Sequence, residues 1–302
     1  MKGLDAIIGV FDRLQQRWRL AAIGYAVVKK FGDDQAGQMV VALGWYGFTA
    51  IFPLLLVVVT ILGFIGTPAL GTTVVSTLHQ FPVIGPDFNP AHGSKNLHGS
   101  LFGLVAGLLV LLYGAQGVTE TAQAAMATVW NVPAGFRPRF VGRLGRSVAA
   151  LGLIGSCFVA NAALGALATA DREGGFVRAL VGAAMVVADV VLYTATFRVL
   201  TPRPVRTRDL VPGAVVGAVG FTVLTTVGAG LVEHQIRNSS NTYGQFGLVI
   251  GLVGYLLLLA RLSLYGAELN PVLAHRLWPR SLRPGQEPEP SEADLTPSDK
   301  LS

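Results

Sequence analysis

Residues 44–64 read GWYGFTAIFPLLLVVVTILGF, a run that contains no charged residue and carries Pro53 near its centre. An apolar run of about 20 residues is long enough to cross the hydrocarbon core of a bilayer as a helix. Pro53 lacks an N–H and its ring clashes with the carbonyl of Thr49, so we expect a kink there. In lipid the freed carbonyl needs a partner inside the protein, and a hydroxyl such as that of Thr49 is a usual one. A static bend that only aids packing is the alternative interpretation.

The composition of the whole chain is that of a membrane protein. Of its 302 residues, 52% are hydrophobic and 13% are charged, whereas soluble domains carry about 25% charged residues. The 37 glycines agree with this class, because small residues let transmembrane helices approach closely. The single cysteine, Cys157, excludes an intrachain disulfide and a CxxC redox site. We therefore expect lipid to cover much of the surface.

Six segments are long and apolar enough to be membrane helices. They are Met39–Gly66, Leu101–Gln123, Ser147–Ala170, Ala179–Phe197, Leu210–Val232 and Phe246–Leu264. The sequence therefore predicts an all-α fold, a polytopic bundle of six transmembrane helices.

The basic residues predict the orientation of this bundle. Nineteen of the 23 lysines and arginines lie before the first span, between spans two and three, between spans four and five, or from Arg261 onward. By the positive-inside rule both termini are cytoplasmic and Thr67–Ser100 is external. This distribution also accounts for the isoelectric point of about 9.7. No interleaved aromatic and basic face accompanies the charges, so we expect the bilayer, and no nucleic acid, as a partner.

The chain divides into three parts. Residues 1–35 contain an apolar face with i, i+3, i+4, i+7 spacing from Leu4 to Tyr25, which predicts an amphipathic helix in the cytoplasmic interface. Packing of this helix on the bundle is the alternative. Residues 36–278 form the membrane domain. Residues 279–302 are rich in Pro, Glu and Ser, which predicts a disordered cytoplasmic tail.

Polar residues within or beside the predicted spans are candidate functional residues, because ionisable groups in a membrane are costly. Asp189 lies near the middle of the fourth span, where a neutral, purely structural carboxyl is the alternative. On the second helix, Gln116, Glu120 and Gln123 share one face and are predicted to line a polar groove with Asn161. For Glu120, the alternative is that it marks the cytoplasmic end of the span.

Arg261, Tyr265 and Glu268 have the same spacing at the end of the sixth span. Arg261 is close enough to the interface to extend its guanidinium into it, which favours a structural role. Glu268 precedes Asn270–Pro271, where we expect the helix to break. It is either half of a gating pair or an anchor at the helix end.

Three stretches carry a resemblance to a known family. GWYGFTAIFPLLL resembles the first-span motif of the YihY/BrkB family of bacterial inner-membrane proteins, with the aromatic pair Trp45–Tyr46 and the Phe52–Pro53 step. Ala50 stands where the family usually has Ser. GVTETAQAAMATVWNV at 117–132 is similar to the region after the second span. NTYGQFGLVIGLVGYLLLLARLSLYGAELNPVLA at 241–274 is similar to the final span, which closes on Gly-Ala-Glu-Leu-Asn.

The resemblance implies six spans, cytoplasmic termini and a bacterial inner membrane. Members of the family carry a ribonuclease label or are linked to serum resistance or to the export of lipid or lipopolysaccharide precursors. We interpret the chain as a transporter or flippase-like exporter of an amphipathic or lipid-linked envelope precursor, with a membrane scaffold for envelope assembly as the alternative. No Walker A, HExxH or GxSxG motif and no paired-carboxylate motif occurs. We therefore expect no enzymatic activity, cofactor or metal, and the ribonuclease interpretation is disfavoured.

Overall fold

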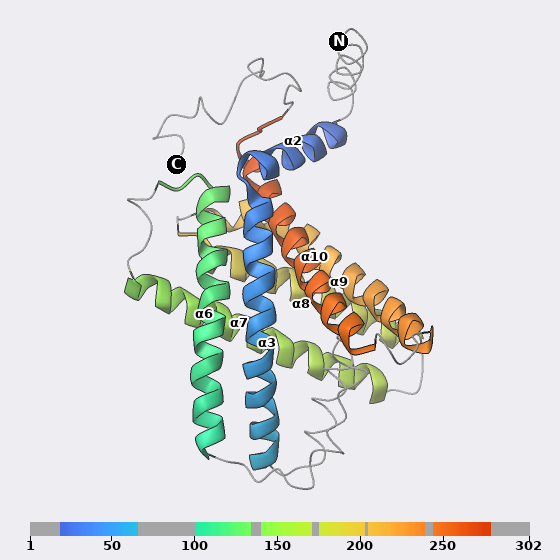
Figure 1. Cartoon of the computed structure of the whole chain (residues 1–302). Coiled ribbons are helices and arrows are strands. Elements are labelled where there is room, and N and C mark those ends of the chain that lie inside the picture. The colour runs from blue at the N-terminus through green and yellow to red at the C-terminus, as the bar shows by residue number, and fades with distance from the viewer. Residues whose placement is uncertain are drawn as a thin grey trace.

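The computed structural model describes residues 19–65, 101–133, 140–170, 175–202, 205–238 and 244–278, and every regular element in these ranges is a helix. The seven helices are α2 (Arg19–Asp33), α3 (Ala36–Ile65), α6 (Leu101–Val129), α7 (Phe140–Ala170), α8 (Gly175–Leu200), α9 (Thr207–Asn238) and α10 (Gly244–Ala274) (Figure 1). The prediction of an all-α fold is confirmed for these residues.

The predicted spans coincide with the six long helices α3 and α6 to α10, apart from Gly66 at the end of the first span. Three segments among the described residues are long and apolar enough to cross a membrane: Ala179–Leu200, Thr207–Gly228 and Val249–Ala274. The first half of the N-terminal segment, the segment Thr67–Ser100 and the tail 279–302 lie outside the described residues. Crossing by all six helices stays a prediction.

Helices α3 and α6 lie side by side, α10 packs on both α3 and α9, and α7 packs on α8 (Figure 1). Large apolar side chains point outward from these helices, among them Val187 and Val191 on α8, Val223 on α9 and Ile250 on α10. A contiguous apolar exterior is unfavourable in water. This exterior therefore fits a bilayer.

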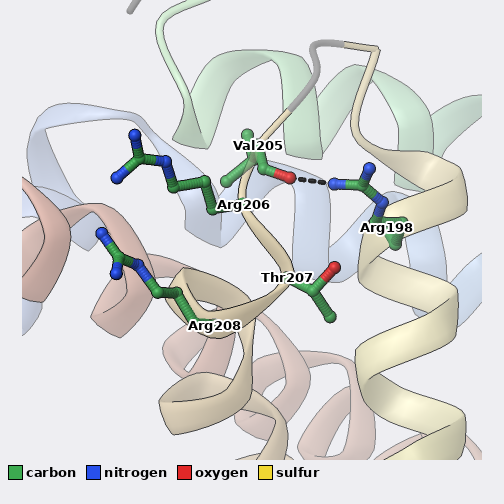
Figure 2. A pocket seen from close by; sticks show the side chains of 5 residues that line it. All are labelled: Arg198, Val205, Arg206, Thr207 and Arg208. Carbon is green, nitrogen blue, oxygen red and sulfur yellow. Dashed lines mark hydrogen bonds between the residues drawn. The ribbon is translucent and has the colours of Figure 1, made fainter.

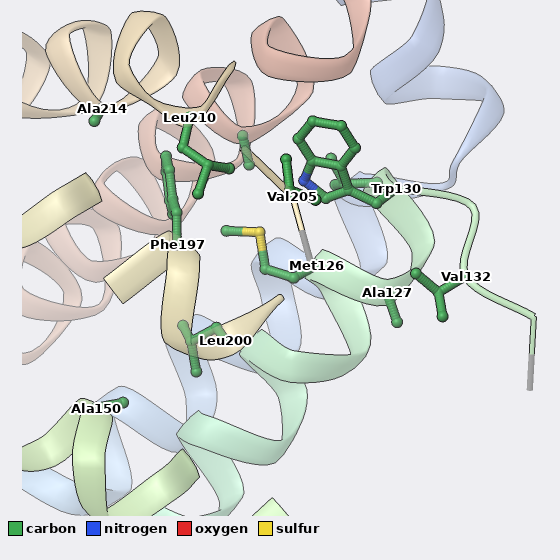
Figure 3. Close-up of a cluster of buried hydrophobic side chains, with 12 residues drawn as sticks. Met126, Ala127, Trp130, Val132, Ala150, Phe197, Leu200, Val205, Leu210 and Ala214 are labelled. Carbon is green, nitrogen blue, oxygen red and sulfur yellow. The ribbon is translucent and has the colours of Figure 1, made fainter. Parts of the chain in front are cut away.

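Among the described residues, the largest buried cluster lies where one set of helix ends meets. Met126 and Trp130 at the end of α6 pack with Phe197 and Leu200 at the end of α8 and with Leu210 at the start of α9 (Figure 3). The connections that join these ends are the ones predicted to be cytoplasmic. This core thus holds the ends of α6, α8 and α9 together, next to the polar contacts described below.

Helices α9 and α10 approach most closely at two glycines. A Cβ added to Gly213 would clash with the carbonyl oxygen of Gly266, and one added to Gly266 would lie 2.6 Å from that of Gly213. The backbone N–H of Gly213 donates to Asn270 Oδ1 at 2.7 Å. Because no side chain separates the backbones here, the amide of Asn270 can reach α9 directly.

The expected break at Asn270–Pro271 is wrong, because α10 continues through Pro271 to Ala274. The extra turn is held by tertiary contacts: Asn270 bonds to α9, and Pro271 and Val272 are fully buried. The helix closes on Arg276, which has a φ of 53°, with a hydrogen bond from Leu277 N to Val272 O of 3.0 Å. This is the common way to end an α-helix, with one residue in the left-handed conformation directly after the last turn.

Candidate functional site

A buried charge cluster joins α2 to α10. Lys30 Nζ lies 2.6 Å from Asp34 Oδ2 and 3.3 Å from Glu268 Oε2. The side chains of Lys30 and Glu268 are both 0% exposed. Among the described residues, no donor meets either Glu268 oxygen with hydrogen-bond geometry, so this pair is held by charge at close range. The Lys30 ammonium therefore lies between two carboxyl groups, that of Asp34 after α2 and that of Glu268 on α10.

The turn between α2 and α3 puts Lys30 in this position. Lys30 lies in the last turn of α2, and the N–H of Asp34 donates to its carbonyl at 2.9 Å. Gln35 has a φ of 51° and lies at the turn that leads into α3. The i, i+4 spacing brings the ammonium onto the Asp34 carboxylate.

The α10 face predicted from Arg261, Tyr265 and Glu268 packs on this same turn of α2. Tyr265 stacks on Phe31 with ring centroids 4.3 Å apart. The exposed guanidinium of Arg261 lies 6.0 Å from the Phe31 ring centroid, within range of a cation–π contact. The three residues therefore share one face, as their spacing predicts, and that face binds α2 through aromatic and charged contacts.

Sequence reasoning does not identify Lys30 and Asp34 as neighbours of Glu268. It uses Lys30 only as one of the basic residues that predict the orientation of the bundle. The i, i+4 spacing of Lys30 and Asp34 could have predicted their ion pair. No comparable sequence pattern links Lys30 to Glu268, which lies far along the chain. The described part of α2 also packs on α10 through Ala26 and Val27. The structure thus describes a contact of Arg19–Asp33 with α10, and the interfacial placement of the N-terminal helix stays a prediction.

Asp189 has a partner on another helix, as a buried carboxyl in a span requires. Its side chain is 6% exposed, and Asn161 Nδ2 on α7 donates to its Oδ1 at 2.9 Å. One turn further along α8, the hydroxyl of Tyr193 lies 3.2 Å from the Ser263 hydroxyl on α10. Sequence reasoning missed this second contact. Asp189 and Tyr193 thus place polar groups along one face of α8 inside the bundle.

The polar residues of α6 form a separate group. Gln116 Nε2 donates to Glu120 Oε1 at 3.2 Å within the helix. Gln123 Nε2 and Thr119 Oγ1 donate to Ser147 Oγ on α7, at 3.2 and 2.7 Å. The sequence pattern marks Ser147 only as the start of a span, so its part in this group is not evident without the helix contacts.

Asn161 and Gln123 belong to different layers of the bundle. Gln123 contacts α7 at Ser147, and Ser147 is separated from Asn161 by about 21 Å of helix rise. The structure therefore brings Asn161 to Asp189 and Gln123 to Ser147.

At the first predicted span, Thr49 Oγ1 donates to the carbonyl of Trp45 at 2.9 Å. Helix α3 is continuous across Pro53. The side chain of Pro53 lies outside the described part, so the kink stays a prediction. Within the described ranges, no group of three or more His, Cys, Asp or Glu side chains is arranged to hold a metal ion.

An all-helical chain with apolar candidate spans, an apolar exterior and buried charges between its helices is a helical membrane protein. The sequence model of a protein family described as virulence factor BrkB matches residues 27–291, and the chain belongs to this family. The resemblance stated from the three sequence motifs is thereby confirmed. No curated protein and no solved structure matches the chain.

Proposed function

We propose that this protein is a six-span inner-membrane transporter, flippase-like in action, that exports an amphipathic or lipid-linked envelope precursor, with both termini in the cytoplasm. The observation that carries the proposal is the burial of ionisable side chains at helix contacts: Lys30, Glu268 and Asp189. Such residues are costly in a membrane bundle and mark substrate or proton paths. A protein that only holds partners together gains nothing from them, because apolar residues of similar size fill the same contacts at lower cost.

The proposal gives the two carboxyl groups related roles. Asp189 lies inside the bundle between α7 and α8 and offers a group that a proton or a cargo hydroxyl can bind. Glu268 lies where α2 meets α10, with its carboxyl oxygen 3.3 Å from the Lys30 ammonium in a fully buried contact. A proton taken up by Glu268 removes its charge and weakens the hold of α10 on Lys30. Coupling to a proton gradient follows, with no catalytic step and no cofactor.

The proposal is tested in proteoliposomes that contain the purified full chain and a short-chain fluorescent phosphatidylglycerol as the probe. An imposed pH gradient should accelerate the loss of probe from one leaflet, measured by quenching with a membrane-impermeant reductant. Asp189→Asn and Glu268→Gln should lower the rate about tenfold or more, since each removes an ionisable group from the path. Asp33→Asn, which removes an exposed carboxylate of α2, is the matched control and should keep the rate.

Liposomes with the wild-type chain that are no faster than protein-free liposomes would contradict transport of this class of cargo. Equal rates for all three variants would contradict the roles of Asp189 and Glu268. In the first case the scaffold interpretation becomes the better one.

A further inference from the structure

A basic cavity lies at the connection between α8 and α9. It has a volume of about 520 Å³ and is lined by Arg198, Val205, Arg206, Thr207 and Arg208. Figure 2 shows the side chains of Arg206 and Arg208 projecting together to one side of the connection, whereas the side chains of Thr207 and Arg198 lie on its other side. The guanidinium of Arg198 approaches from the end of α8 and donates to the Val205 carbonyl.

The cavity is attached to the rigid part of the molecule. Val205 is buried in the core formed by the helix ends, together with Phe197, Leu200 and Leu210. Arg198 follows Phe197 directly, so its backbone is fixed by the same core. The core therefore fixes the backbone that carries the arginines, while the side chains of Arg206 and Arg208 are exposed and can reach a ligand.

The charge of the cavity calls for an anion. The carboxylate that the structure shows near these arginines is that of Asp209, 3.7 Å from Arg208 Nε. Three guanidinium groups and one carboxylate leave a net charge of two positive units. The start of α9 adds the positive end of the helix dipole. The positive-inside rule requires basic residues in this connection, but it does not require two of them to project side by side at an open hollow.

The position of the cavity identifies the source of the anion. Arg198 lies at the end of the candidate span Ala179–Leu200, and Thr207 begins the candidate span Thr207–Gly228. The two helix ends that border the cavity, the end of α8 and the start of α9, are therefore ends of apolar spans, which lie at the depth of the lipid headgroups. Arginine binds phosphate through two parallel hydrogen bonds, a geometry that a lysine-rich surface does not offer.

We propose that this cavity binds the phosphate group of an anionic lipid headgroup. Arg206 and Arg208, whose side chains project to the same side, hold the phosphate oxygens. Arg198 lies across the connection, holds the Val205 carbonyl and adds to the positive potential from there. The assignment rests on the membrane placement of α8 and α9 and not on transport. Its test is a binding measurement, so a failure of the headgroup site is distinguishable from a failure of the proposed transport.

The experiment uses the purified full chain in an uncharged detergent and three probes: dihexanoyl phosphatidylglycerol, dihexanoyl phosphatidylcholine and inorganic phosphate. Phosphatidylglycerol should bind more tightly than the other two. Arg206→Gln with Arg208→Gln should weaken its binding about tenfold or more, because two charge-assisted contacts are lost. The control pair, Arg143→Gln with Arg276→Gln, removes the same charge from exposed arginines that do not line the cavity, and should change binding by about twofold or less.

Three results would overturn the proposal: equal weakening in both pairs, equal affinity for the two lipids, or an affinity for inorganic phosphate that matches that for phosphatidylglycerol. If the cavity pair of variants does not fold, labelling of the wild-type chain decides. A phosphatidylglycerol with a photoreactive headgroup should label the peptide that contains residues 198–209. Labelling confined to other peptides would refute the site.

Discussion

Replacing Lys30 with Met tests how the buried charges between α2 and α10 are balanced. The change removes the ammonium that lies 2.6 Å from Asp34 and 3.3 Å from Glu268, and it leaves two carboxylates without this cation. Breaking a buried ion pair by removing one partner costs about 3–5 kcal/mol of folding free energy. Glu268→Gln should cost less, about 1–3 kcal/mol, because Lys30 keeps its short contact with Asp34 and only one side of the cluster loses its charge.

The double variant Lys30→Met with Glu268→Met completes the comparison. It removes the fully buried pair and leaves Asp34, whose side chain is 10% exposed and can turn toward water. Its free energy of unfolding should therefore recover most of the loss caused by Lys30→Met alone. Reversible unfolding in mixed micelles, followed by tryptophan fluorescence, gives the free energies of the wild-type chain and the three variants. A Glu268→Gln variant as unstable as Lys30→Met, or a double variant less stable than either single one, would refute this account of the cluster.

Three further predictions follow from other parts of the molecule. Gly266→Ala should destabilise the protein by about 1–3 kcal/mol, since its Cβ would lie 2.6 Å from a backbone oxygen of α9; Gly254→Ala, which meets no atom within 4 Å, should be neutral or slightly stabilising in the same thermal unfolding assay. Asp189→Asn should fold and lose transport, whereas Asp189→Leu should lower the yield of folded protein in size-exclusion chromatography; an active Asn variant would make the residue structural. In a background without the native cysteine, an impermeant thiol reagent on intact cells should modify Lys95→Cys and not Pro290→Cys, and the reverse pattern would overturn the predicted orientation.

The positions of the long helices are predictable because they depend on a property of the linear sequence. An apolar run of sufficient length is helical in a membrane whatever it packs against. For the same reason the spacing of Arg261, Tyr265 and Glu268 identifies a common face of α10 before any partner is known. The end of α10 is not predictable in this way, because the local effect of Pro271 points to a break, whereas the buried contacts of Asn270 and Val272 keep the helix intact.

The partners of the polar residues are not predictable, because they depend on how the helices cross. Nothing in the spacing of Asp189 indicates that the side chain opposite is Asn161, and nothing in the α2 sequence indicates that Lys30 meets α10. Sequence reasoning groups Asn161 with Gln123 by polarity. The structure separates them along α7, because α6 and α8 contact that helix at different heights.

The stretch Gly-Ala-Glu-Leu-Asn near the end of α10 shows why one short motif can matter to a whole bundle. Gly266 admits the backbone of α9, and Asn270 then holds the Gly213 N–H. Ala267 lies in the core of helix ends, and Leu269 packs in the cluster that contains α2. Four of the five residues are thus accounted for by close packing or by a bond that packing permits. Glu268 is different, because an apolar side chain would fill its place without the cost of a buried charge. Its carboxylate is therefore the member of the motif for which packing gives no reason, and the one whose neutral variant most directly separates a transport role from a structural one.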